Sequence, residues 1–382
     1  MVEATEARLA DAICAAVSDR RVLRVSGGHT KDGLGGTPHG MPLSTLDLRG
    51  IVDYDPAELV VTVRAGTPLA ELQAALAAQG QMLPFEPPAW PGATVGGTVA
   101  SGLAGPRRAF AGGVRDALLG VRLLDGRGQV LRFGGRVMKN VAGFDLFRLQ
   151  AGAWGRLGVL LEVSFRLLPL PQREVSVRLP MPADEAILHM NQLAGEPLPL
   201  SAAAWWEGAL YLRLSGSVAG VDAALPRIGG ERLDPVVASR LWADCAGVPS
   251  GLAETQAAAE HVPLWRLAVP ATTRSLAAGG ETAIDWCGGL RWLRTDAPAD
   301  EVRALAASLG GHATAWHGNP ARPAMHPLDP VRLALHRRLF EAFDPHGVFD
   351  NGRFDAHRGA DAADAGATAL HVADRTAVEA GT

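Results

Sequence analysis

The sequence predicts an α+β protein with at least two domains. Its 382 residues, 48% hydrophobic and 20% charged, are enough to bury two ordinary globular cores. Between Gln172 and Leu328, strand-like runs alternate with alanine-rich helical stretches, which indicates an α+β domain with an antiparallel sheet. The part before it combines short β-branched strands with long glycine-rich loops. Pro169 and Pro171 mark the boundary between the two parts.

Apolar spacing and end signals predict the elements of the first part. They are a helix over 7–17, a strand and turn over 46–54, and strands over 22–25, 59–65, 118–124, 129–133 and 160–168. Thr67 as N-cap and Pro68 at the first helical position predict a helix over 69–79, which Gly80 ends. The turn residues 125–128 predict a hairpin between the two strands beside them.

The second part shows the same two periodicities in turn. We expect strands over 174–179, 209–214, 265–269 and 290–293, and helices over 183–193, 221–228 and 299–308. An amphipathic helix over 331–343 follows, with Leu335 and Leu339 on its apolar face. Residues 356–382 contain few large apolar side chains, so we expect a disordered tail there.

Composition excludes several classes of function. A net charge of −4 provides no basic field for nucleic acid. Three widely spaced cysteines (Cys14, Cys245 and Cys287) predict free thiols in a reducing compartment. Acidic residues from Glu3 onward argue against a signal peptide over 1–17. The sequence contains no run of 18 apolar residues free of charges, so it predicts no transmembrane segment. We therefore expect a cytoplasmic protein.

Two glycine-rich segments predict a main-chain anion site. Residues 26–30 follow an apolar strand, and residues 91–102 contain glycines dense enough to permit positive φ and close approach to a ligand. Successive N–H groups in such a loop form a concave anion trap, which favours a diphosphate. The segment 91–102 is neither a P-loop nor a Rossmann fingerprint, because no Gly-Lys-Ser/Thr ends it and no strand leads straight into it.

The order of these segments resembles a known superfamily. A strand ending in Gly-Gly, a Pro-Gly-Ala-x-x-Gly-Gly loop, an Arg-Asp pair and a Gly-x-Leu-Gly-Val turn are similar to the FAD-binding domain of the vanillyl-alcohol-oxidase/PCMH flavoproteins. The stretches 80–84, 103–108 and 133–146 resemble, more closely, the E-subunit family of bacterial glycolate oxidases. The similarity extends from about residue 20 to about residue 355.

That resemblance implies FAD as cofactor and a PCMH-type, two-subdomain FAD-binding domain with an α+β cap. The implied division is 1–170 for the FAD-binding domain, 171–328 for the cap or substrate domain, 329–355 for a C-terminal segment that returns to the FAD domain, and 356–382 for the tail. The expected cofactor-binding residues are Ser26, Gly27, Gly28, His29, Thr30, Pro91, Gly92, Ala93, Thr94, Val95, Gly96, Gly97, Val99, Ser101, Gly102, Gly158 and Val159.

His29 supports two interpretations. In several oxidases of this superfamily, a histidine in a Gly-Gly-His loop is bonded covalently to the flavin, and Ser26-Gly27-Gly28-His29 has that form. In the E-subunit family the matching residue is usually small or polar, and a neutral imidazole there can donate a hydrogen bond or face solvent. Arg107 and Arg115 are equally open between anion binding and structural ion pairs.

No catalytic residue is assigned by the sequence. Arg266 and Arg291 are candidates to hold a substrate carboxylate as a bidentate fork. The alternative, which we favour, is an arginine paired with Asp285 and stacked on a tryptophan. We also expect no metal site: His312, His317 and His326 have no acidic residue among them at ligand spacing.

The resemblance implies a flavoprotein subunit that oxidises glycolate, a small 2-hydroxy acid, to glyoxylate by hydride transfer to FAD. The implied partners are a larger flavoprotein subunit and an iron–sulfur subunit that pass electrons towards quinone. Any attachment to the cytoplasmic face of the inner membrane would be through these partners. Two alternatives remain. One is an independent FAD oxidase of a hydroxy acid, alditol or sugar, with flavin tethered to His29. The other is a non-catalytic flavin-binding scaffold of the complex.

Overall fold

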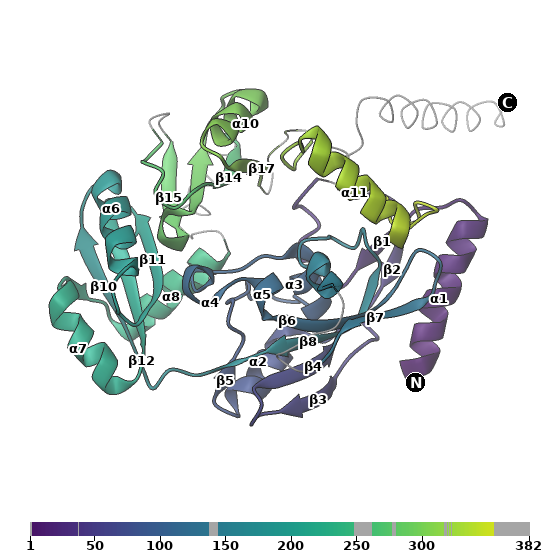
Figure 1. Cartoon of the computed structure of the whole chain (residues 1–382), viewed down its shortest axis with the longest axis horizontal. Helices are drawn as coiled ribbons and strands as arrows, with labels where there is room; N and C mark the ends of the chain where they lie inside the picture. Colours follow the sequence, from purple (N-terminus) through teal and green to yellow (C-terminus); the bar gives the residue numbers. More distant parts are fainter. Residues whose placement is uncertain are drawn as a thin grey trace.

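The computed structural model describes residues 2–354, with gaps at 37, 137–143, 248–261, 277–279, 317–318, 320 and 322. The expected tail over 356–382, residues 137–143 of the E-subunit motif, and His317 lie outside the described residues. Two lobes stand side by side, each built on its own sheet (Figure 1). We call residues 2–169 the N-terminal lobe and residues 173–316 the cap lobe.

The N-terminal lobe is built on a five-stranded antiparallel sheet with strand order β3-β4-β8-β6-β7. Its elements are α1 (Val2–Ser18), β1 (Leu23–Ser26), β2 (Met41–Ser44), β3 (Ile51–Asp55), β4 (Val60–Arg64), α2 (Leu69–Ala77), β5 (Gln81–Met82), α3 (Val95–Ser101), α4 (Arg108–Ala111), α5 (Val114–Ala117), β6 (Leu118–Leu124), β7 (Val130–Gly134), η1 (Leu146–Gln150), β8 (Val159–Arg166) and β9 (Leu168–Pro169). The predicted hairpin between β6 and β7 is confirmed.

Two hydrophobic cores lie on this lobe's sheet. Helices α2 and α3 pack on it through Leu72 and Val99, which are fully buried against Val63. Helix α1 buries Leu9 and Ile13 in a second core with β1, β2 and β8. Burial of this kind, at about 25 cal/mol per Å² of apolar surface, is the main favourable term in folding.

Two local predictions for this lobe were wrong. Thr67 does not cap α2: its Oγ1 accepts a hydrogen bond from the Gly50 N–H at 2.9 Å, and the N-cap residue is Pro68. The order of strand and turn expected over 46–54 is reversed: residues 46–47 form a turn, and the strand follows as β3, which pairs with β4. In both cases a contact with another segment decides the local conformation.

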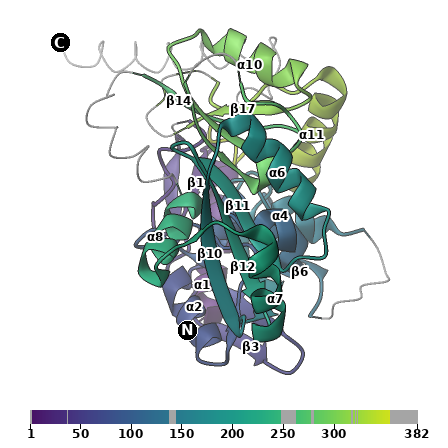
Figure 2. The same ribbon diagram turned by 90° about the vertical axis from the view of Figure 1, so that its left-hand side faces the viewer.

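The cap lobe is an eight-stranded sheet with strand order β13-β10-β12-β11-β15-β16-β14-β17. Its elements are β10 (Arg173–Pro180), α6 (Ala183–Ala194), β11 (Leu200–Trp206), β12 (Ala209–Gly216), α7 (Val218–Ile228), β13 (Glu231–Arg232), α8 (Pro235–Ala246), β14 (Leu264–Ala268), β15 (Glu281–Asp285), η2 (Trp286–Gly288), β16 (Leu290–Arg294), α10 (Ala299–Ser308) and β17 (His312–Ala315). Every pairing in it is antiparallel, as expected. Figure 2 shows α6, α7 and α8 around the half that contains β10–β12.

The C-terminal part of the described chain returns to the N-terminal lobe. Helix α11 (Pro330–Phe343) buries Phe343 in the core of that lobe, and the Phe343 carbonyl accepts from the Gly126 N–H at 2.8 Å. Beyond the helix, the Val348 carbonyl accepts from the Leu23 N–H at 2.7 Å, next to β1. This path brings Arg353 beside the loop that follows β1.

Candidate functional site

A cleft of about 760 Å³, part of which is open solvent, lies in the N-terminal lobe where β1 ends. Its walls are the loop after β1, the start of α3, and the turn before β8. The lining residues are Val25, Ser26, Gly27, Gly28, His29, Thr30, Lys31, Asp32, Thr45, Ala65, Thr94, Gly96, Gly97, Ala100, Gln150, Trp154, Gly155, Gly158, Leu160 and Arg353.

Close backbone approach explains the glycines of this cleft. A Cβ atom built on Gly28 would lie 1.6 Å from the carbonyl oxygen of Gly92, and one on Gly27 would lie 2.4 Å from Oγ1 of Thr94. A Cβ on Gly96 would lie 2.8 Å from the Cβ of Ala65. Only glycine fits such positions, so the two predicted segments are packed directly on one another.

The hydrogen bonds of the two segments differ. In the part of the chain that the structure describes, the main-chain N–H groups of Gly27, Gly28, His29 and Thr30 donate to no other residue. By contrast, residues 95–97 form the first turn of α3, whose N–H groups donate to Thr67 O, Ala65 O and Thr94 Oγ1. Residues 95–101 therefore form a capped helix and not the open anion trap that the glycine density suggested. A continuous run of unused donors lies in 27–30.

Two buried cations add positive charge to the cleft. Burial lowers the pKa of Lys31 to about 8, and burial also lowers the pKa of Arg353 to about 10. Arg353 stacks on the ring of Trp154 at 4.8 Å and donates to the carbonyls of Leu34 and Lys31. Both groups stay protonated at neutral pH, so the cleft favours an anion.

The residues present fit the diphosphate of FAD. Oγ of Ser26 is buried and has no hydrogen-bond partner within the described residues, so it is a donor or acceptor available to a ligand. A buried polar atom of this kind is normally satisfied, by protein, water or ligand. Free main-chain N–H groups, a free hydroxyl and two cations therefore line one cleft. The backbone segments of this cleft are too close together to admit larger side chains at the glycine positions.

The predicted cofactor residues fall into two layers. Ser26, Gly27, Gly28, His29, Thr30, Thr94, Gly96, Gly97 and Gly158 line the cleft. Gly92 packs against Gly28 but does not line the cleft, and Val95, Val99 and Val159 are core residues. Pro91, Ala93, Ser101 and Gly102 are likewise not among the lining residues. Sequence reasoning missed Lys31, Trp154 and Arg353; the Gly-x-Leu-Gly-Val turn over 155–159 was the one signal next to Trp154.

His29 lies in the wall of the cleft in a left-handed conformation, with φ of 57°. Its Nδ1 is 2.9 Å from Oδ2 of Asp32, and the imidazole is half exposed. The geometry therefore gives His29 a local partner, and Asp32 orients the ring.

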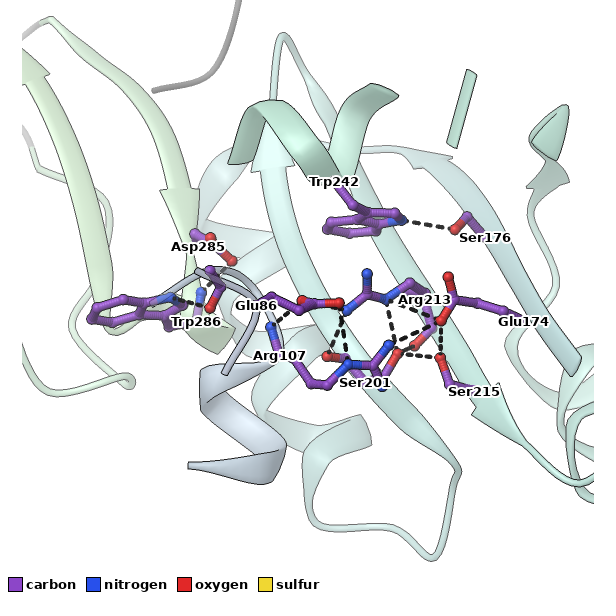
Figure 3. Close-up of polar contacts among 11 residues, drawn as sticks. Glu86, Arg107, Glu174, Ser176, Ser201, Arg213, Ser215, Trp242, Asp285 and Trp286 are labelled. Atoms are coloured by element: carbon purple, nitrogen blue, oxygen red, sulfur yellow. Dashed lines mark hydrogen bonds and ion pairs between the residues drawn. The ribbon is translucent and has the colours of Figure 1, made fainter. Parts of the chain in front are cut away.

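Arg107 has a structural role: it belongs to a buried network of ion pairs between the two lobes, shown in Figure 3. Its Nε donates to Glu86 Oε1 at 3.1 Å and its Nη2 to Glu174 Oε2 at 3.0 Å. From the cap lobe, Arg213 on β12 donates to Glu86 Oε2 at 2.8 Å and to Ser201 Oγ at 2.9 Å. Each lobe thus contributes one acid and one arginine, and each arginine bonds the other lobe's acid.

Electrostatics within this network favour the charged forms. Burial acts to raise the pKa of Glu86, but the charges and hydrogen bonds of Arg213 and Arg107 outweigh it, and the pKa lies below the usual value. Ser215 adds a hydrogen bond to Glu174 at 2.5 Å, and Trp242 donates to Ser176 at 2.8 Å beside it. The network fixes the cap lobe against the loop that contains Glu86.

The two candidate substrate arginines have different surroundings. Arg291 is fully buried, and its guanidinium donates to the main-chain carbonyls of Gly288 and Thr273 at 2.7 and 2.5 Å. Arg266 stacks on Trp286 at 4.8 Å and on Trp316 at 5.7 Å. The stacking that we favoured is present, but no ion pair joins Arg266 to Asp285 within the described residues.

Neither a metal cluster nor a membrane span is found in the described part. The His312 and His326 rings lie edge to face, 6.5 Å apart, and no three metal-binding side chains come together among the residues with described positions. No helix between residues 2 and 354, the gaps aside, is long and apolar enough to cross a bilayer.

Comparisons with known proteins place this chain among flavoprotein relatives. A family model described as an FAD binding domain matches residues 2–134. The chain is 42% identical over 344 residues to glycolate oxidase subunit GlcE of Escherichia coli (strain K12), covering 89% of this chain and 95% of that one. It is 31% identical over 151 residues to glycolate oxidase subunit GlcD of Bacillus subtilis (strain 168), covering 40% of this chain and 32% of the relative.

A solved structure confirms the fold class. Alkyldihydroxyacetonephosphate synthase superposes with a TM-score of 0.60 at 14% identity, covering 89% of this chain and 73% of that chain. At this identity the likeness concerns the fold alone. Together with the FAD binding model, it confirms the expected α+β fold with an FAD-binding domain.

Proposed function

This chain belongs to the GlcE family of glycolate oxidase subunits, and from that premise we propose that it is the FAD-binding subunit of a complex that oxidises glycolate to glyoxylate. Bound FAD would supply the acceptor for the hydride that leaves C2 of the hydroxy acid. The contact between Gly28 and Gly92 is the observation that carries the proposal, because it joins both predicted cofactor segments at one cleft.

In this proposal the chain's own residues have distinct roles. The N–H groups of residues 27–30 and Oγ of Ser26 bind the diphosphate, while Lys31 and Arg353 balance its charge. The start of α3 forms the opposite wall and keeps the cleft narrow. We propose that Gly158 and Val159 lie beside the flavin ring, as the family resemblance implies.

Partner subunits complete the function. Relatives include both GlcE and GlcD subunits of glycolate oxidase, which supports a multi-subunit complex. We propose the larger flavoprotein and an iron–sulfur subunit as partners. The chain's three cysteines are widely spaced in sequence, and two of them, Cys245 and Cys287, are buried, so electrons must leave through a partner. Location in the cytoplasm, with the membrane reached through partners, stays a prediction.

We also propose the division 1–170, 171–328 and 329–355 for the FAD-binding domain, the cap and the returning segment. The two separate sheets and the packing of Phe343 on the N-terminal lobe support it.

Anaerobic mixing of the purified, FAD-loaded chain with glycolate tests the function. Bleaching of the flavin absorbance by glycolate supports a catalytic flavin in this chain. Reduction by an alditol or sugar instead supports the independent oxidase. FAD that no donor reduces, yet that the assembled complex requires for activity, supports the scaffold.

A further inference from the structure

One face of the cap sheet is turned towards the N-terminal lobe. Along β14, Trp265 and Leu267 point to the other face, where they pack with α10 residues such as Val302. Because side chains alternate along a strand, Leu264 and Arg266 share the face towards the N-terminal lobe. Leu264 packs there in a cluster that includes Leu34 and Leu103 of that lobe.

This cluster reaches from the cap to the cofactor cleft. It contains Trp286, Trp292 and Trp316 of the cap and, at its edge, Trp90 and Trp154 of the N-terminal lobe. Trp154 lines the cleft, and Lys31 lies 5.3 Å from the ring of Trp90. The indole N–H of Trp286 donates to the Gly105 carbonyl at 3.0 Å and so ties the two lobes together at this point.

Arg266 brings a partly exposed guanidinium to this cluster. Its guanidinium stacks on Trp286 and Trp316 but donates no hydrogen bond to any residue whose position the structure describes. The buried arginines Arg107, Arg213 and Arg291 all have hydrogen-bond acceptors. Because Arg266 is partly exposed and uses no protein acceptor within the described residues, its N–H groups remain open to water or to a ligand.

The surroundings of Arg266 carry excess positive charge. Burial, and next to it the charge of Arg108, lowers the pKa of Arg266 to about 10, so it is protonated at neutral pH. Arg108 stacks on the same Trp286 ring at 4.1 Å. Burial raises the pKa of Asp285 to about 7; its Oδ1 accepts from the Trp286 N–H at 2.6 Å and its Oδ2 is buried without a partner. Burial thus disfavours the ionised form of Asp285, the acid whose charge acts on Arg266.

Resting on the proposed function, we propose that Arg266 binds the carboxylate of the small 2-hydroxy acid and thereby holds the substrate against the flavin of this chain. A guanidinium provides the two parallel N–H groups that a carboxylate accepts. The indole N–H of Trp316, buried and without an acceptor in the described part of the chain, is a further donor beside it. The two tryptophan rings on which Arg266 stacks take the place of part of its surrounding water, which strengthens a charge pair.

The test uses the FAD-loaded full chain and oxalate, a small carboxylate that cannot be oxidised by hydride loss. Oxalate is titrated while the flavin absorbance is followed, in the wild type and in Arg266→Gln, Arg266→Lys and Arg240→Gln. Arg240 is an exposed arginine of α8 and serves as the matched control. Ethylene glycol, which has two carbons and no carboxylate, serves as the neutral ligand.

We expect saturable perturbation in the wild type and in Arg240→Gln, and at least about tenfold weaker oxalate binding in Arg266→Gln. Arg266→Lys should recover part of the affinity, because it keeps the charge without the fork. Ethylene glycol should perturb the flavin absorbance to the same extent in all four proteins. If Arg266 had only a structural role, its replacement should change the response to both ligands.

The FAD content of each protein separates the possible failures. A wild type that binds no FAD contradicts the proposed function itself. FAD-loaded wild type that oxalate does not perturb overturns the assignment of Arg266, as does Arg266→Gln with full FAD content and wild-type affinity for oxalate. Should Arg266→Gln not fold, equal oxalate affinity of Arg266→Lys and the wild type overturns it as well.

Discussion

Gly28 and Gly92 lie in direct contact: a Cβ atom on Gly28 would stand 1.6 Å from the carbonyl oxygen of Gly92. The two residues belong to segments far apart in the chain, the loop after β1 and the loop before α3. A protein Cβ essentially never comes within 3.0 Å of such an atom, so any side chain at residue 28 displaces one segment from the other. The cofactor cleft depends on this contact.

Replacing Gly28 by alanine should therefore impair FAD binding. We expect the dissociation constant for FAD to rise at least about tenfold, because the backbone must move to admit a methyl group. Titration of the apo-protein with FAD, followed by fluorescence, measures the change. Gly135→Ala is the matched control, since a Cβ there would meet nothing within 4 Å. Equal affinities of the two variants would contradict the role of the contact.

Lys31 predicts a pH dependence of FAD affinity. Burial lowers its pKa to about 8, and a bound diphosphate favours the protonated amine. Affinity should thus be full below that pH and fall as the pH rises through it. Lys31→Met should bind FAD more weakly and lack this phase. Dissociation constants measured on both sides of pH 8 test this, and a wild-type profile that stays flat across it excludes Lys31 as a ligand of the cofactor.

The Glu86–Arg213 ion pair should stabilise the contact between the lobes. Removing one partner of a buried pair typically costs about 3–5 kcal/mol, so Arg213→Met should lower the free energy of unfolding by about that range. Denaturant unfolding measures the loss. The exposed pair Arg49–Glu71 provides the control, where Glu71→Gln should change stability by about 0–1 kcal/mol.

The same pair also predicts a loss of stability in acid. Since the pKa of Glu86 is lower in the folded protein than its usual value, its contribution is present above the usual pKa. It is lost as the pH falls through the folded value. Glu86→Gln should remove this part of the acid dependence, and an unchanged profile would mean that another carboxylate causes it.

His29 should not hold the flavin covalently. Its Nδ1 lies 2.9 Å from Oδ2 of Asp32, which gives the imidazole a partner within its own loop. Acid precipitation of the holoprotein should leave the yellow colour in the supernatant. Colour that remains in the pellet, and is lost in His29→Ala, would support the tethered oxidase.

Strong local signals predicted much of the fold. The β-branched strand at β4, the β6–β7 hairpin and the helices α6, α7, α10 and α11 came out within a few residues. Strand β11 was missed, because Ser201 to Ala204 carry no β-branched signal and form a strand through pairing with β12 and β15. Glycine density at residues 96–97 hid the helix α3, which Thr94 caps and the sheet beneath it supports.

The cofactor site was predictable where one sequence segment carries it. The glycines of the loop 26–30 predict that the backbone closely approaches a ligand there, and the loop does line the cleft. Arg353 and Lys31 gave no such sign, because a cation becomes part of a site only when folding brings it there. The same holds for Arg266 and Arg291, which look equivalent in sequence and differ only in what surrounds them.

Addition of FAD to the purified apo-chain is the most direct test of the central claim, that the two glycine segments form one cofactor site. The account predicts one bound FAD per chain, seen as retained flavin absorbance after gel filtration, together with a higher melting temperature. A colourless protein whose melting temperature does not respond to FAD would contradict it.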